Sequence, residues 1–330
     1  MRCLLVLFVL LNFNSTAQVI KKLSTDTKTN IRGMSVVSDD VIWICGSNGM
    51  VAKSFNGGKS WRWKRLPNFE KTDFRDIVAL DENTAILMAV GEPGVILRTD
   101  DGGVKWKQVY VNTTPGIFLD AVGFWNEKLG IALGDPIKNK FVVARTYDGG
   151  ITWHDVDHDS RPSSEEGEAC FASSGTNMRT IDEQCFFVTG GKNANIYING
   201  KPNPLPIIHG KPSQGANSLA IKGKNTFIVV GGDFDQPDAT VQNCCISKDG
   251  GLKWTVPQTP PSGYRSCVEY ISKKTWITCG YNGVDISNDE GMNWSKISSD
   301  SYNVCKKAKK GSVVFLAGNN GLIAKMEEKK

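Results

Sequence analysis

The segment Thr99-Asp-Asp-Gly-Gly-Val-Lys-Trp106 decides the fold of this chain, because four closely similar segments accompany it. The other copies are Ser54-Phe-Asn-Gly-Gly-Lys-Ser-Trp61, Thr146-Tyr-Asp-Gly-Gly-Ile-Thr-Trp153, Ser247-Lys-Asp-Gly-Gly-Leu-Lys-Trp254 and Ser287-Asn-Asp-Glu-Gly-Met-Asn-Trp294. An Asp at the head of a tight turn accepts hydrogen bonds from the backbone N–H groups that follow. The later glycine supplies a positive φ, and the tryptophan opens the next strand as a buried anchor. This pattern, Ser/Thr-x-Asp-x-Gly-x-x-Trp, is called here the turn motif, and we expect it to serve folding.

The spacing of the turn motif predicts seven repeated units. Its tryptophans lie at positions 61, 106, 153, 254 and 294, at intervals of 45, 47, 101 and 40 residues. The longest interval equals two periods with one motif missing. An apolar run that ends in glycine recurs seven times, at Gly46, Gly91, Gly134, Gly190, Gly231, Gly280 and Gly318. Units of this length built from short strands are typical of propeller blades. We therefore expect an all-β, seven-bladed β-propeller with four-stranded blades, with six or eight blades as alternatives.

The two ends of the chain are expected to share one blade. The seventh unit, from Tyr302 to Met326, ends after its third strand and lacks the turn motif. The segment from Gln18 to Ser24 has the pattern of the missing outer strand. Pairing the N- and C-terminal strands would remove an open sheet edge. Residues 18–330 are accordingly predicted to form a single propeller.

Residues 1–17 have the features of a cleaved export signal. Arg2 precedes an apolar run of 11 residues, Cys3 to Phe13, and a small-residue cleavage site follows at Ala17. A membrane-spanning helix needs about 20 apolar residues, and no other stretch is long enough. We therefore expect an exported protein, periplasmic or secreted, with no transmembrane segment after cleavage.

Composition narrows the classes of function. The 39 Lys+Arg and 34 Asp+Glu give a formal charge of +5, too small for a dedicated nucleic-acid binder. The chain has three histidines and no CxxC or Cys/His spacing, so we expect no metal site and no cofactor. Most of the eight cysteines that follow the signal are predicted to be free, buried thiols.

A candidate binding site follows from the propeller geometry. The first strand of each blade lines the central channel, and the loops that enter these strands open on one face, called here the channel mouth. Arg32, Arg75 and Arg265 start the first strands of blades one, two and six, which lie in one arc of a closed ring. Aromatic Tyr264 accompanies them. The facing blades offer the acidic residues Asp120, Asp135, Glu168 and Asp233.

We therefore expect a channel mouth that is basic on one side and acidic on the other. Arginine clusters bind carboxylate or phosphate by bidentate geometry. The alternative is that these charges pair with each other or with neighbouring loops.

The turn motif resembles the Asp-box (BNR) repeat of sialidases, sortilins and related propellers. Further segments resemble exported bacterial propellers similar to the photosystem II stability/assembly factors: Gly134-Asp-Pro136, Gly167-Glu-Ala-Cys-Phe-Ala-Ser-Ser-Gly-Thr176, Gly190-Gly191, Gly231-Gly-Asp233, Gly263-Tyr-Arg-Ser266 and Gly283-Val-Asp-Ile-Ser287. The resemblance implies a seven-bladed propeller that binds another protein. The chain departs from the motif at Asn56, which replaces Asp, and at Tyr197-Ile-Asn-Gly200, where blade four has lost the motif. The name oxidoreductase that such proteins often carry has no support here, because no GxGxxG lies between a strand and a helix.

The sequence is compatible with two functions. The first is a non-enzymatic scaffold that binds a protein or peptide partner at the channel mouth, with a glycan as an alternative ligand. The second is a sialidase-like glycoside hydrolase whose arginines hold a carboxylate sugar. Its candidates are Tyr264 or Tyr302 as nucleophile, Glu168 or Glu269 as base and Asp120 or Asp76 as acid. Sialidases carry Arg-Ile-Pro before the first motif, whereas this chain has Ile31-Arg32-Gly33-Met34.

Overall fold

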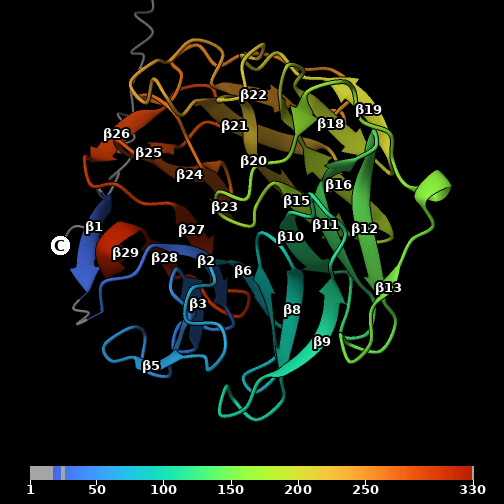
Figure 1. Cartoon of the computed structure of the whole chain (residues 1–330). Coiled ribbons are helices and arrows are strands. Elements are labelled where there is room, and N and C mark those ends of the chain that lie inside the picture. The colour runs from blue at the N-terminus through green and yellow to red at the C-terminus, as the bar shows by residue number, and fades with distance from the viewer. Residues whose placement is uncertain (1–17, 24–26, 329–330) are drawn as a thin grey trace, which may run out of the picture.

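The computed structural model describes residues 18–23 and 27–328. Their strands form seven antiparallel sheets, which Figure 1 shows around a common centre. The first strand of each blade lies nearest that centre, and these strands are β2, β6, β10, β15, β20, β23 and β27. The predicted all-β, seven-bladed propeller is confirmed. The expected export signal, residues 1–17, lies outside the described residues.

Most blades follow one four-stranded plan. Blade I is β2 (Ile31–Val36), β3 (Ile42–Gly46), β4 (Met50–Ser54) and β5 (Arg62–Arg65). Blade II is β6 (Phe74–Ala79), β7 (Ala85–Ala89), β8 (Gly94–Thr99) and β9 (Lys107–Asn112). Blade III is β10 (Leu119–Phe124), β11 (Gly130–Ile137), β12 (Lys140–Thr146) and β13 (His154–Asp155). Blade IV is β15 (Met178–Ile181), β16 (Gln184–Val188), β18 (Asn195–Ile198) and β19 (Lys201–Pro204). Blade VI is β23 (Cys267–Ser272), β24 (Thr275–Gly280), β25 (Gly283–Ser287) and β26 (Ser295–Ser298).

Blades V and VII depart from this plan. Blade V is β20 (Gln214–Lys222), β21 (Thr226–Asp233) and β22 (Cys244–Ser247), extended on its inner side by β17 (Gly190–Gly191) and β14 (Glu168–Ala169). Blade VII is β27 (Val304–Lys307), β28 (Val314–Ala317), β29 (Ile323–Glu328) and β1 (Gln18–Leu23). Two short 3-10 helices, η1 (His158–Ser160) and η2 (Asn319–Gly321), complete the described elements.

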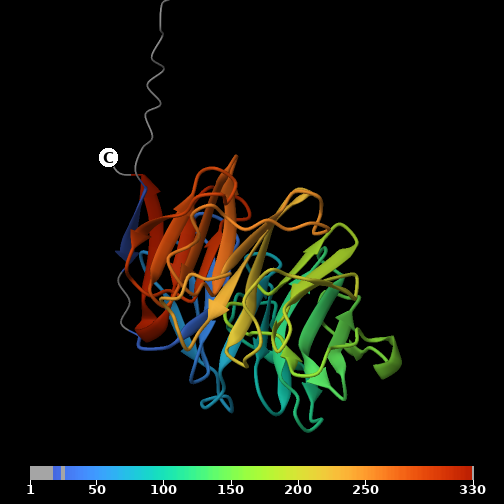
Figure 2. The same cartoon turned by 90° about the horizontal axis from the view of Figure 1, so that it is seen from above.

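The closure expected between the chain ends is confirmed. Strand β1 pairs antiparallel with β29 along its whole length, from Gln18 opposite Glu328 to Leu23 opposite Ile323. Figure 2 shows the blue strand against the red one at one edge of the molecule. Ile20 and Leu23 pack against the buried cluster that joins blades VI, VII and I. The first strand of the chain therefore completes the last blade.

The acid of the turn motif accepts backbone N–H groups, as predicted, and the hydroxyl of the motif adds a second acceptor. In blade III, Thr146 Oγ1 accepts the N–H of Gly150 at 2.9 Å and donates to Asp148 Oδ1 at 2.8 Å. The same Asp148 oxygen accepts the N–H groups of Ile151 and Thr152 at 3.0 Å. These bonds satisfy the backbone N–H groups of the turn.

In blade I an amide replaces the acid of the turn motif. Asn56 Oδ1 accepts the N–H of Ser60 at 2.9 Å and the Ser54 hydroxyl at 3.1 Å. The substitution therefore retains the acceptor that the turn requires.

Steric crowding explains why the apolar run ends in glycine at several blades. A Cβ atom on Gly46 would lie 2.5 Å from the carbonyl oxygen of Asn30, and one on Gly134 would lie 2.4 Å from that of Phe118. Each of these carbonyls belongs to the chain that enters the first strand of the blade. Glycine therefore lets the second strand approach that entry segment, at the channel-mouth end of the sheet.

The core lies between neighbouring blades. Trp43 of blade I meets Trp106 of blade II edge to face, with ring centroids 6.0 Å apart. Trp153 of the blade III motif packs with Ile86 of blade II, and Trp294 of blade VI packs with Ile228 of blade V. Each motif tryptophan thus ties its own blade to the preceding one.

All eight cysteines of the described residues are free, and all except Cys185 are buried. This agrees with the expected structural thiols. Among residues 18–23 and 27–328 no helix has the length and apolar character required to cross a membrane.

Removing the packing of β1 should weaken ring closure. We expect Ile20→Ala and Leu23→Ala each to lower the free energy of unfolding by about 1–3 kcal/mol, because each removes apolar contacts with blades VII and I. Lys21, which forms an exposed ion pair with Glu327, serves as the control. Lys21→Ala should cost less than about 0.5 kcal/mol in urea unfolding. Equal losses for all three variants would contradict this account of closure.

Candidate functional site

A pocket of about 340 Å³ opens at the channel mouth. Four of the predicted residues line it, namely Arg32, Arg75, Asp135 and Tyr264. The other lining residues are mostly aromatic or small: Phe118, Ala169, Cys170, Phe171, Ala172, Ser173, Phe234 and Tyr281. The structure therefore brings together half of the eight predicted residues, from blades I, II, III and VI.

Each of the two arginines of the pocket forms one hydrogen bond and keeps further donors without a partner among the described residues. Arg32 donates from Nη1 to the carbonyl oxygen of Ser173 at 3.3 Å, whereas its Nε is buried and has no hydrogen-bond partner. Arg75 donates from Nε to Asp73 Oδ2 at 2.7 Å, and its guanidinium lies 5.9 Å from the centroid of the Phe118 ring. Arg32 thus retains an unused donor, and Arg75 retains its two terminal amino groups.

An aromatic wall faces these arginines. Phe171 and Phe234 meet edge to face at 6.0 Å, and Phe234 meets Tyr264 in the same way at 6.3 Å. Tyr281 lies 5.0 Å from Tyr264, measured between ring centroids. Sequence reasoning selected only Tyr264 of this set. The available signal was an aromatic residue next to a candidate charge, as in Phe234 after Asp233; no such signal marks Phe171, which follows Cys170.

The floor of the pocket is the segment that enters blade IV and crosses the channel. Ser173 donates to Asn217 Oδ1 of blade V at 2.8 Å, and Ser174 donates to the carbonyl oxygen of Ser266 beside blade VI at 2.8 Å. A Cβ atom on Gly175 would lie 2.2 Å from Asp76 Oδ1 of blade II. Contacts with blades on several sides therefore block the channel and separate the mouth pocket from its other end.

A buried carboxyl pair lies behind one wall. Asp120, Asp135 and Cys170 each present a ligand atom within 4.8 Å of the others. Both oxygens of Asp120 are buried without a hydrogen-bond partner, whereas Asp135 Oδ1 accepts the Cys170 N–H at 2.8 Å. Burial and the neighbouring Asp135 raise the pKa of Asp120, and burial raises the pKa of Asp135 to about 6. A shared proton or a bound cation would relieve the repulsion between two such groups.

The carboxylates of two further predicted acids accept hydrogen bonds from neighbouring side chains. Glu168 is buried and accepts from Tyr197, Asn195 and Thr189, at 2.8, 2.9 and 2.5 Å. Asp233 is also buried and accepts from Gln214 Nε2 at 3.0 Å. Neither residue lines the mouth pocket. The alternative in which the charges pair with neighbouring loops applies to both.

Arg265 does not complete the expected arc. Its side chain is fully buried and bound to Asp285, with Nε 2.6 Å from Oδ2. It also donates to the carbonyl oxygen of Tyr264 at 2.7 Å and to Asn282 Oδ1 at 2.6 Å. The basic side of the mouth therefore consists of Arg32 and Arg75. Arg265 instead stabilises the chain around Tyr264 through its buried hydrogen bonds.

The residues proposed for hydrolysis are not assembled around one pocket. Glu269 and Asp76 line a different pocket, at the far ends of the inner strands, where Arg179 pairs with Glu269 at 3.3 Å. Tyr264 lines the mouth, and burial raises the pKa of its hydroxyl, which opposes a nucleophilic role. The buried hydroxyl of Tyr302 has no partner.

Comparison with known proteins supports the family resemblance. Residues 13–159 match the family model described as photosynthesis system II assembly factor YCF48. The photosystem II assembly lipoprotein Ycf48 of Synechococcus sp. (strain CC9902) is 26% identical over 117 residues. The chain resembles the Ycf48 assembly factors. The match covers 34% of this chain and 35% of the Synechococcus protein, so the chain spans about a third of that relative.

Solved Ycf48 structures share the fold over nearly the whole chain. The structure described as YCF48 bound to D1 peptide has a TM-score of 0.65 at 15% identity, covering 97% of this chain and 99% of that one. YCF48 from Cyanidioschyzon merolae has a TM-score of 0.66 at 15% identity, covering 93% and 98%. At these identities the likeness to Ycf48 structures bears on the fold alone.

Replacing the buried Arg265 by alanine should destabilise the protein more than replacing Arg75 of the mouth pocket. Arg265→Ala is expected to lower the free energy of unfolding by about 3–5 kcal/mol, because it leaves the Asp285 carboxylate buried and unpaired. Arg75→Ala should cost no more than about 1 kcal/mol, since the Arg75–Asp73 pair is partly exposed. Urea unfolding of both variants measures the difference. A small loss for Arg265→Ala would contradict its assignment as a structural residue.

The carboxyl pair should make stability fall as pH rises. Burial raises the pKa of Asp135 to about 6 and, together with Asp135, raises the pKa of Asp120 well above its usual value, so stability is expected to decrease from about pH 4 and to keep falling above pH 6 until Asp120 has ionised. Asp120→Asn removes the charge repulsion, so we expect a shallower fall and a gain of about 1–3 kcal/mol at pH 7.5. The control is Asp40→Asn at an exposed carboxyl, and thermal unfolding across pH 4–8 measures both. An Asp120→Asn curve that parallels wild type would refute this coupling.

Proposed function

We propose that this protein is an exported, non-catalytic propeller that binds a peptide segment of a partner protein in the channel-mouth pocket. The observation that carries the proposal is the combination, in one pocket, of Arg32 and Arg75, whose terminal amino groups are not all engaged, and the wall of Phe171, Phe234 and Tyr281. Guanidinium groups recognise carboxylates, and aromatic rings bind apolar side chains. A peptide that presents both an apolar side chain and a carboxylate fits these two surfaces.

The comparisons support the same class of ligand. A propeller of matching fold is described as bound to the D1 peptide, and the curated relative is described as an assembly lipoprotein. An assembly lipoprotein is an exported protein, which accords with the signal sequence proposed for residues 1–17. The hydrolase alternative is weakened by the separation of Glu269 and Asp76 from Tyr264.

The proposal is tested with peptides selected from a displayed library of random twelve-residue sequences with free carboxyl termini. We expect the selected peptides to share an aromatic or aliphatic residue near a carboxylate. Their affinity for Arg32→Ala/Arg75→Ala should fall at least tenfold, about 1.4 kcal/mol, because the carboxylate loses its donors. Fluorescence polarisation with labelled peptides measures the affinity.

A matched control removes two exposed cations elsewhere. Arg62→Ala/Lys107→Ala makes the same change of net charge away from the mouth. It should leave peptide affinity unchanged. Equal affinity for both double variants, with folding verified by circular dichroism, would reject the mouth as the binding site.

A further inference from the structure

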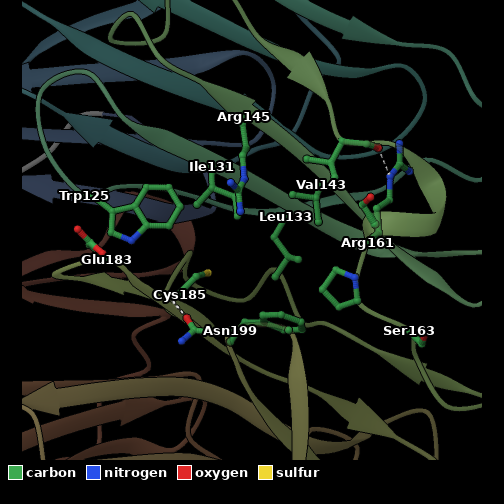
Figure 3. A pocket seen from close by; sticks show the side chains of 15 residues that line it. Trp125, Ile131, Leu133, Val143, Arg145, Arg161, Ser163, Glu183, Cys185 and Asn199 are labelled. Carbon is green, nitrogen blue, oxygen red and sulfur yellow. Dashed lines mark hydrogen bonds between the residues drawn. The ribbon is translucent and has the colours of Figure 1, made fainter.

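A second pocket, of about 400 Å³, lies between blades III and IV. Figure 3 shows Ile131, Leu133 and Val143 of blade III on one side and Cys185 of blade IV on another. Arg145, Arg161 and Glu183 are the charged residues that line it. This inter-blade cleft shares no lining residue with the channel-mouth pocket.

At other blade interfaces a motif tryptophan packs at the corresponding place. Between blades I and II, Trp106 packs edge to face on Trp43, and the pocket that it lines with Val51 and Lys53 is smaller, about 200 Å³. Counting from the marker glycine and from the first residue of the turn motif, the corresponding residues of blade III are Ile131, Val143 and Arg145. All three line the inter-blade cleft. The cleft is therefore the position that a blade IV tryptophan would occupy.

Blade IV lacks that tryptophan because its turn is shorter. Asn199 and Gly200, both with positive φ (50° and 80°), connect β18 directly to β19. This is a two-residue hairpin turn of the kind that closes antiparallel strands tightly. The chain continues as Lys201-Pro-Asn-Pro204, so no aromatic side chain follows. Asn199 and Gly200 line the cleft instead.

The missing motif also removes a hydrogen-bond acceptor. The residue before the motif is a cation in the first three blades. In blade II Arg98 donates to the carbonyl oxygen of Gly149, which belongs to the blade III turn motif, at 3.2 Å. In blade I Lys53 donates instead to the carbonyl oxygen of Glu82, which lies between β6 and β7, outside the motif. Arg145 occupies the same position in blade III, yet it has no hydrogen bond or ion pair within residues 18–23 and 27–328. Figure 3 shows its side chain at the wall of the cleft, near Ile131.

We propose that the inter-blade cleft binds a peptide segment of a partner protein that inserts a tryptophan side chain and offers an oxygen acceptor to Arg145. The partner thereby supplies in trans the indole that a turn motif supplies at other interfaces, and the carbonyl acceptor that the motif supplies between blades II and III. The apolar side chains of Leu133, Val143 and Phe187 bury the indole. Because Arg145 and Arg161 outnumber Glu183, an acidic residue beside the tryptophan complements the rim. This site is additional to the peptide site proposed at the channel mouth.

The probe is a synthetic peptide with the sequence of residues 99–106, acetylated, amidated and labelled with fluorescein. Its control is the same peptide with alanine in place of the tryptophan. We expect saturable binding of the tryptophan peptide to the full chain and at least tenfold weaker binding of the control. Absence of binding, or equal affinity for the two peptides, would overturn the proposal.

Protein variants locate the bound peptide. Cys185→Trp places an indole inside the cleft and should abolish binding, while Arg145→Ala should weaken it at least threefold. Lys107→Ala, at an exposed cation elsewhere, is the matched control and should bind as wild type does. Arg145→Ala keeps the test valid if Cys185→Trp does not fold, because Arg145 is exposed and unpartnered. Unchanged affinity in Arg145→Ala would overturn the assignment of the acceptor site.

The proposals for the channel mouth and for the inter-blade cleft can be tested separately. Arg32→Ala/Arg75→Ala should bind the tryptophan peptide with wild-type affinity, since neither residue lines the inter-blade cleft. Loss of binding in that double variant would place the peptide at the channel mouth and overturn the cleft as its site.

Discussion

The backbone pairing of β1 with β29 is the interaction on which the arrangement of the whole molecule depends. A propeller blade packs only against its two neighbours, so a break between the last blade and the first would leave apolar faces and a sheet edge open. The ladder from Gln18 to Leu23 removes that edge, and the cluster around Phe315 joins blades VI, VII and I. Arg32 of blade I and Tyr264 beside blade VI can share a pocket only because the ring is closed in this way.

Within the ring, the turn motif has two separate physical effects. Its hydroxyl and carboxylate satisfy the N–H groups of a tight turn, and its tryptophan packs against the preceding blade. These effects are separable, as blade IV shows. A two-residue turn at Asn199 and Gly200 connects the strands without the motif, but it leaves no side chain to fill the space against blade III. Loss of the motif therefore preserves the hairpin and opens a cleft beside an unpartnered arginine.

The channel mouth owes its character to a segment that belongs to no blade sheet of its own. Ser173 and Ser174 cross the channel and bind blade V and the start of blade VI through hydrogen bonds. This closes the channel, so the mouth becomes a shallow pocket with a polar floor and an aromatic wall. The same segment places Cys170 beside Asp120 and Asp135, and the Cys170 N–H donates a hydrogen bond to Asp135.

The sequence by itself determined the repeat, the number of blades, the missing motif of blade IV and the closure by the two chain ends. These features follow from local patterns, because each blade repeats the same turn chemistry and alternation of apolar residues. Arg32, Arg75 and Tyr264 lie at or just before the start of first strands and Asp135 follows the marker glycine of β11, and all four line the mouth pocket. Only the tertiary structure decided which charges remain available. Arg265 and Asp285 are 20 residues apart in the chain, and Glu168 lies 29 residues from Tyr197. Burial of a charge demands a partner, but no local pattern specifies which residue the fold brings to it.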